Sequence, residues 1–210
     1  GTVESAIDRA RALAGDPLVK AVIALGYGAT NEATQAAFGD LSVVVVGYWG
    51  AKPTLPNIFI LNNRTMDDII PLPDSAREIT AAAQMDTPIK GGDVLALKQF
   101  PLLNQNTETV TVVSSGNLPD ADFVARYLES GAFTPQPGLL ATLTYDATRL
   151  VLDAIANVGN GNVSAALADI EYKGLNGNIR FQGSYWVDAP IHYFGYDANG
   201  SLVPIDGLIE

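Results

Sequence analysis

The stretch AVIALGYGATNEATQAA, residues 21–37, runs an apolar segment into a glycine turn and then into a helix start rich in small polar side chains. Apolar runs without polar alternation are typical of strands that are covered on both faces, as in a parallel sheet. Residues 42–46 and 58–61 repeat the pattern. The stretch therefore predicts a strand, a loop and a helix of an α/β fold.

The rest of the chain extends this alternation. Apolar spacing and capping residues predict helices at 3–14, 75–83, 140–155 and 164–170, and strands at 19–25, 42–46, 58–61, 93–97 and 109–113. Short strands joined by glycine and asparagine turns are expected in the tail, at GNIRF, IHYFGYD and SLVPI. The order predicts a Rossmann-like fold with a mostly parallel sheet flanked by helices.

Composition argues against several classes of function. The 210 residues carry a formal net charge of −11, which disfavours binding to nucleic acid or to an anionic membrane surface. The absence of cysteine excludes disulfides, thiolate metal sites and cysteine nucleophiles, and it fits an extracytoplasmic protein. No apolar run approaches the roughly 18 residues of a membrane span, and the first residues do not resemble a signal peptide. We expect the leader to be absent from this chain.

The sequence carries no recognisable catalytic or metal-binding pattern. The single histidine, His192, lies on an expected strand and is interpreted as structural or surface-exposed. No Gly-x-Ser-x-Gly elbow or phosphate-loop signature occurs, and the carboxylates lack ion-loop spacing. Asp146 is interpreted as a charge at the start of its helix, one turn from Arg149. We therefore expect no catalytic residue, no metal and no cofactor.

Dinucleotide binding is the strongest enzyme-like alternative, because Gly26 and Gly28 follow a predicted strand. The position of the third glycine of that fingerprint is Asn31, however. The second strand ends in Gly47 and Tyr48, where an acidic residue would be needed for the ribose hydroxyls. The pattern therefore does not favour a dinucleotide.

The turn after the first predicted strand has the composition of an anion pocket. In α/β folds, ligands bind beyond the carboxyl ends of the strands, where loops offer backbone N–H groups. Thr30, Asn31 and Thr34 are suited to donate to a carboxylate, and Gly26 and Gly28 allow a ligand to approach the backbone. The alternative is an ordinary capped strand-to-helix turn, which is a common structure.

Three segments together resemble the type 1 periplasmic binding proteins, the leucine/isoleucine/valine-binding family of ABC-transporter receptors. They are AIDRARALAGDPLVKAVIALGYGATNEATQAA (6–37), FVARYLESGAFTPQPGLLATLTYDATRLVLDAI (123–155) and GLNGNIRFQGSYWVDAPIHYFGYDANGSLVPI (174–205). They cover nearly half of the chain, in the family's order and spacing. The resemblance implies an extracytoplasmic receptor that captures a small solute without catalysis.

The resemblance also implies a ligand site. Thr30 matches the family's hydroxyl residue that receives the ligand carboxylate, and Tyr145 matches a tyrosine near the cleft between the two lobes. In the loop YWGAKPTL, Ala51 stands where many members have a ligand-holding threonine, while Trp49 is either a stacking wall or a packing residue. The complete set of predicted ligand-binding residues is Gly28, Ala29, Thr30, Asn31, Trp49, Gly50, Ala51 and Tyr145.

Compared with family members, the chain is expected to lack the first strand and helix and much of the second lobe. We divide it into an N-terminal lobe-like segment (1–62), a reduced second lobe or connection (63–138), and a helix with closing strands that return to the first lobe (139–210), or else into one compact domain. The expected partners are a carboxylate-bearing solute such as an amino acid, an ABC-transporter permease and a second copy of the chain. The alternative function is a ligand-free or sensory module of the same fold that dimerises.

Overall fold

The computed structural model describes residues 2–26, 28, 31–50, 52–70, 88–103, 107–159 and 161–205. Its helices are α1 (Val3–Ala14), α3 (Glu32–Ala37), α4 (Met66–Ile69), the 3-10 helix η1 (Asp93–Ala96), α6 (Phe100–Leu103), α7 (Ala121–Leu128), α8 (Leu139–Val158) and α9 (Val163–Asp169). Its strands are β1 (Ala21–Leu25), β2 (Ser42–Val46), β3 (Ile58–Leu61), β4 (Ile89–Gly91), β5 (Val110–Ser114), β6 (Tyr172–Gly174), β7 (Gly177–Ile179), β8 (Phe181–Gln182), β9 (Tyr185–Trp186), β10 (His192–Tyr196) and β11 (Leu202–Pro204).

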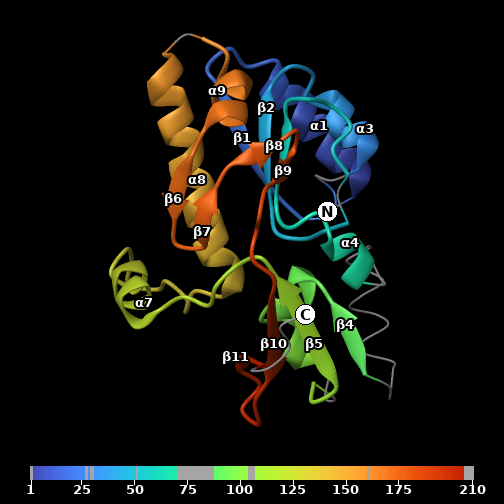
Figure 1. Cartoon of the computed structure of the whole chain (residues 1–210), viewed down its shortest axis with the longest axis vertical. Helices are drawn as coiled ribbons and strands as arrows, with labels where there is room; N and C mark the ends of the chain where they lie inside the picture. Colours follow the sequence, from blue (N-terminus) through green and yellow to red (C-terminus); the bar gives the residue numbers. More distant parts are fainter. Residues whose placement is uncertain are drawn as a thin grey trace.

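The first sheet has the order β1-β2-β3-β9-β8, and its first four strands run parallel. Every residue of β2 and β3 is buried, as the continuous apolar runs predict. Side chains on the two faces of β2 pack in different hydrophobic cores. Val44 and Val46 pack with α8 and α9, whereas Val43 and Val45 share a core with Ala10 of α1. Figure 1 shows the two helix layers on opposite sides of this sheet. The predicted α/β class is therefore confirmed.

The second sheet has the order β11-β10-β5-β4 and lies beyond the carboxyl ends of β2 and β3 (Figure 1). Strands β4 and β5 are parallel, while β10 runs antiparallel to β5 and β11 antiparallel to β10. The strands near the C-terminus therefore belong to two sheets: β8 and β9 return to the first sheet, but β10 and β11 lie in the second. The expectation that all of them return to the first lobe is wrong, because β10 finds its pairing partner in β5. The segment boundaries themselves stay a prediction.

The predicted strand at 93–97 is wrong. Residues 93–96 form η1, in which the Leu95 N–H donates to the Gly92 carbonyl at 3.0 Å, and the strand before it is β4. A short apolar run does not distinguish a strand from a buried helical turn. Here tertiary contacts decide, because Asp93 and Leu95 are both fully buried and both point into the interior.

The other predicted elements agree with the structure where it describes them. The predicted helix at 3–14 is α1, whose N-cap Thr2 accepts from the Ser5 N–H at 3.2 Å. The long predicted helix is α8, which ends at Gly159 in a positive-φ conformation. The strand expected at 19–25 begins at Ala21, and the helix expected at 75–83 lies outside the described residues. Among the described helices, none combines the length and the apolar character needed to cross a membrane.

Candidate functional site

A buried carboxylate joins the two sheets. Asp93, the first residue of η1 and separated from β4 by Gly92, has no exposed surface. Its Oδ2 accepts from the Tyr48 N–H, which follows β2, and its Oδ1 accepts from the hydroxyl of Ser114 at the end of β5, each at 2.5 Å. The carboxyl ends of strands from both sheets thus meet at one side chain. This is the position at which parallel α/β sheets bind their ligands.

A second set of bonds connects the loop after β3 to the same place. The Asn63 N–H donates to the Ser115 hydroxyl at 3.0 Å, and the Asn63 side-chain amide donates to the Ala189 carbonyl at 2.5 Å. The Tyr48 hydroxyl donates to Asp67 Oδ1 at 2.9 Å. We define the junction cluster as Tyr48, Asn63, Asp93, Ser114 and Ser115. It holds the carboxyl ends of the strands in direct contact.

Burial changes the acidity of Asp93. Desolvation raises its pKa from 3.8 to about 6, and the hydrogen bonds from Ser114 and from the Tyr48 backbone offset only part of that rise. In the described part of the chain, the ion pairs are Arg11–Asp8 and Arg180–Asp188, so no cation accompanies Asp93. An ionised carboxylate without a cationic partner is costly to bury. Such a group in a strand-end site is a candidate functional residue.

The turn after β1 is described only in part. Thr30 and Ala29 lie outside the described residues. The Asn31 side chain caps α3 by accepting from the Ala33 N–H at 3.0 Å, which agrees with the alternative of a capped turn. A Cβ on Gly28 would meet the Ala6 side chain at 3.3 Å, so this glycine packs closely against α1. The role of these residues in ligand binding stays a prediction.

Trp49 lies in the core in this structure. It is 6% exposed, and its indole N–H donates to the Val46 carbonyl at 2.6 Å. These contacts agree with the packing interpretation of the residue. Gly50 adopts a φ of 67°, a conformation that favours glycine, while Ala51 lies outside the described residues.

Buried Gln35 holds the loop that follows Trp49. Its side-chain nitrogen donates to the Lys52 carbonyl at 2.9 Å, and its oxygen accepts from both the backbone N–H and the hydroxyl of Thr54. This side chain therefore ties the loop to α3. No pattern in the sequence distinguishes Gln35 from an ordinary helix residue.

Tyr145 and Asp146 lie next to one another on α8 but differ in environment. Tyr145 is 42% exposed and packs edge-on against Phe123 of α7, with 5.8 Å between ring centroids. Its described contacts place it beside α7 and not in the junction cluster. Asp146 is fully buried inside α8, so its interpretation as a charge at the helix start is wrong. Its carboxylate accepts from the Leu175 and Asn176 N–H groups, each at 2.9 Å.

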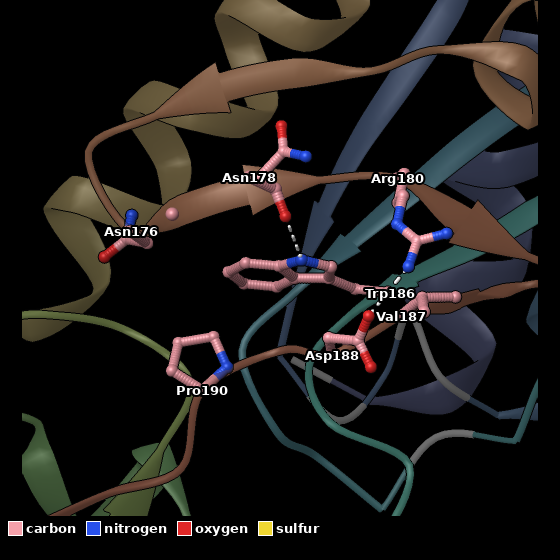
Figure 2. A pocket seen from close by; sticks show the side chains of 8 residues that line it. Asn176, Asn178, Arg180, Trp186, Val187, Asp188 and Pro190 are labelled. Atoms are coloured by element: carbon pink, nitrogen blue, oxygen red, sulfur yellow. Dashed lines mark hydrogen bonds and ion pairs between the residues drawn. The ribbon is translucent and has the colours of Figure 1, made fainter.

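A hollow of about 370 Å³ lies beside Trp186 in the first sheet's half of the molecule. Figure 2 shows the Trp186 indole donating to the Asn178 carbonyl, at 2.9 Å, and Arg180 paired with Asp188, at 2.7 Å. The side chain of Asn176, another lining residue, is bonded to Asp146 at 2.7 Å. Because its principal polar groups already have partners within the protein, this hollow is a weaker candidate than the junction cluster.

His192 lies in register with Ser114 across β10 and β5. Its Nε2 is buried without a hydrogen-bond partner, and burial lowers the pKa of the imidazole. The ring lies 6.2 Å from that of Phe194. Throughout the described ranges, no three histidine, aspartate or glutamate side chains gather as metal ligands would.

None of the five residues of the junction cluster belongs to the predicted ligand-binding set; the sequence analysis missed Tyr48, Asn63, Asp93, Ser114 and Ser115. A signal was present for the two serines, because they directly follow the predicted strand 109–113 and lie at its carboxyl end. For Asp93 the signal was hidden, because the residue was assigned to the start of a strand and not to the loop after one.

Gly92 is expected to be essential to the contact between the sheets. A Cβ on Gly92 would lie 2.6 Å from Tyr48 Cδ1 and 3.3 Å from the Tyr48 carbonyl oxygen, so Gly92→Ala must displace Tyr48. We expect a loss of about 1–3 kcal/mol in the free energy of unfolding, measured by urea titration. Gly15→Ala is the matched control, because its φ is −80° and the nearest atom lies 3.4 Å away. Equal effects of the two changes would contradict the close packing.

No family model and no curated protein sequence matches the chain. Solved structures do match. An ABC-transporter substrate-binding protein from Desulfitobacterium hafniense in complex with leucine has 13% identity and a TM-score of 0.67, covering 98% of this chain and 86% of its own. The branched-chain amino acid substrate-binding protein LivJ from Streptococcus pneumoniae, in complex with isoleucine, has 16% identity and a TM-score of 0.69, covering 98% and 85%.

An extracellular ligand-binding receptor from Desulfohalobium retbaense has 14% identity and a TM-score of 0.70, covering 98% of this chain and 52% of its own. At these identities the likeness concerns the fold, and it agrees with the helix layers and the two sheets described above. The resemblance found in the sequence is therefore confirmed at the level of architecture. The chain has the fold of the type 1 periplasmic binding proteins.

Proposed function

We propose that this protein is an extracytoplasmic solute-binding protein that captures a small amino acid non-covalently where its two sheets meet. The observation that carries the proposal is Asp93, a buried carboxylate at the carboxyl ends of strands from both sheets and without a cationic partner in the described residues. The similar structures from D. hafniense and S. pneumoniae, which hold leucine and isoleucine, support the general kind of ligand.

The proposed ligand carries a positively charged ammonium group and a negatively charged carboxylate group. A ligand ammonium beside Asp93 would supply a positive charge that none of the described residues gives to the buried carboxylate, in exchange for the hydrogen bonds from Tyr48 and Ser114. The ligand carboxylate is assigned to Thr30 and the neighbouring backbone N–H groups, from the resemblance and from the position of the turn after β1. Ala51 stands where many members of the resembled family have a threonine that helps to hold the ligand's amino and carboxylate groups, and the loss of that hydroxyl favours the ligand-free alternative.

Entry of a solute requires the two sheets to separate. The chain passes between them three times, between β3 and β4, between β5 and α8, and between β9 and β10. In the structure the junction cluster is closed by its own hydrogen bonds, so a solute must replace the bonds that Tyr48 and Ser114 make to Asp93. The proposed binding step is therefore an opening and closing of the two sheets about a hinge. Ligand groups and protein groups compete in it for the Asp93 carboxylate.

The test is calorimetric titration with leucine, with isopentylamine, which lacks the carboxylate, and with 4-methylpentanoate, which lacks the amine. We expect leucine to bind and each truncated compound to bind at least tenfold more weakly. Removing either the carboxylate or the amine of the ligand leaves a buried polar group of the protein unpaired. Thr30→Ala is expected to weaken leucine binding and leave that of isopentylamine unchanged. Thr148→Ala, an exposed threonine on α8, is the control. Absence of heat with all proteinogenic amino acids would contradict the proposal.

The second candidate is a ligand-free interaction module that dimerises through the surface where a larger second lobe would lie. The observation in its favour is the closed junction cluster, whose central carboxylate already has donors from the protein itself. Native mass spectrometry of gently purified protein separates the two. A monomer with a retained amino acid favours the receptor, whereas a bare dimer favours the interaction module.

A further inference from the structure

A second and larger cavity lies apart from the junction cluster. It has a volume of about 880 Å³ and is bordered by the segment of η1 and α6, the start of α8 and the turn between β10 and β11. None of the residues that line it belongs to the junction cluster. Its volume lies in the range of pockets that bury small organic ligands.

The walls of this cavity are mostly apolar. They include Leu97, Leu118, Leu139 and Leu202, together with the ring of Tyr196. The Tyr196 hydroxyl donates to the Leu95 carbonyl, and burial raises the pKa of this tyrosine to about 12. The phenol is therefore neutral and already bonded, so its ring acts as an apolar wall at every physiological pH.

Among the described residues that line the cavity, one is a cation and none is an acid. The chain has 23 acidic and 12 basic residues, yet Lys98 is the one charged residue in the part of the lining that the structure describes. Its ammonium donates to the Gln136 carbonyl at 2.6 Å, and an ammonium has three N–H donors, so two remain for a ligand. In a strongly acidic protein, an apolar cavity whose described walls carry a lysine and no carboxylate is complementary to an anion with an apolar body.

We propose that this cavity binds a small amphipathic anion, namely a free monocarboxylate with a medium-length aliphatic chain. In this proposal the aliphatic chain of the ligand lies between the leucine side chains, and the ligand carboxylate pairs with Lys98 at the rim of the cavity. Leu102, which is 84% exposed and lines the same cavity, covers the outer part of the aliphatic chain. The site is independent of the amino-acid site at the junction cluster.

The experiment titrates the full chain with octanoate and with 1-octanol, by calorimetry and by amide chemical shifts. We expect octanoate to bind and to shift the amides of Gly138 and Gly200, which line the cavity, while those of Gly47 and Gly92 beside the junction cluster stay in place. Lys98→Gln is expected to weaken octanoate binding about fivefold at low salt and to leave 1-octanol binding unchanged. Lys173→Gln, an exposed lysine on β6, is the charge-matched control.

Adjacent leucines provide a second control that does not depend on Lys98. Leu102→Asp places an anion at the cavity rim and is expected to weaken octanoate binding at least fivefold, by charge repulsion and lost apolar contact. Leu103→Asp changes a neighbouring side chain, 67% exposed, that does not line the cavity, and it is expected to have no effect. Absence of octanoate binding at millimolar concentration, or shifts confined to the junction amides, would overturn the proposal. Absence of octanoate binding would not bear on leucine binding at Asp93, which the calorimetric titration with leucine tests separately.

Discussion

Replacing Asp93 by asparagine is expected to stabilise the protein at neutral pH and to abolish binding of the proposed amino acid. The asparagine oxygen can accept from the Tyr48 N–H, and its NH₂ group can donate to the Ser114 hydroxyl, so both contacts of the carboxylate have a neutral equivalent. The variant no longer buries a charge. It also no longer offers a negative group to a ligand ammonium.

The effect on stability depends on pH in a defined direction. Burial raises the Asp93 pKa from 3.8 to about 6, so between these values the native state binds more protons than the unfolded state. The contribution of Asp93 to the free energy of unfolding therefore falls as pH rises from about 4 to about 6, and it stays low above that. The difference between the two pKa values corresponds to about 3 kcal/mol, which sets the upper limit of the gain in Asp93→Asn.

Urea unfolding of wild type and variant from pH 4 to pH 8 measures this effect. We expect the two proteins to be similar near pH 4 and the variant to be more stable by about 1–3 kcal/mol at pH 7.5. Asp8→Asn, an exposed carboxylate on α1, controls for the change in net charge. A difference between wild type and Asp93→Asn that stays constant over this range would mean that Asp93 does not titrate as described. Loss of leucine affinity together with a gain in stability would identify Asp93 as a binding residue that costs stability.

Replacing Asp146 by alanine is expected to cause the largest loss of stability. Three donors depend on this carboxylate: the backbone N–H groups of Leu175 and Asn176, and the Asn176 side-chain amide at 2.7 Å. The turn between β6 and β7 approaches so closely that a Cβ on Gly174 would lie 2.4 Å from Asp146 Oδ2. Removal of the carboxylate leaves buried donors without an acceptor. We expect a cost of about 3–5 kcal/mol in the free energy of unfolding.

The measurement is thermal and urea unfolding of Asp146→Ala beside two further variants. Asp146→Asn is expected to recover only part of the loss, because its NH₂ group faces backbone N–H donors. Asp153→Asn, two turns along the same helix and half-buried, is expected to be nearly neutral. A cost below about 1 kcal/mol for Asp146→Ala would show that the turn is held by other contacts.

The local pattern of apolar and capping residues in the sequence determined much of this fold. The apolar runs at 42–46 and 58–61 became β2 and β3 with every residue buried, because a strand that is covered on both faces buries every side chain of such a run. The caps at Thr2 and Asn31 and the glycine after α8 also act locally, since each bond spans only a few residues. Periodicity and capping chemistry therefore place most of the helices and strands.

Tertiary structure decided the site and the pairing of the closing strands. Asp93, Tyr48 and Ser114 are far apart in the chain, and their meeting depends on how the two sheets come together. Asp146 reads from the sequence as a helix charge, but a turn almost 30 residues later supplies its donors. Strand β10 pairs with β5 across about 80 residues. Hydrophobic periodicity records which face of an element is buried, but it carries no information on which distant polar group will be buried with it, and that choice determines the chemistry of the site.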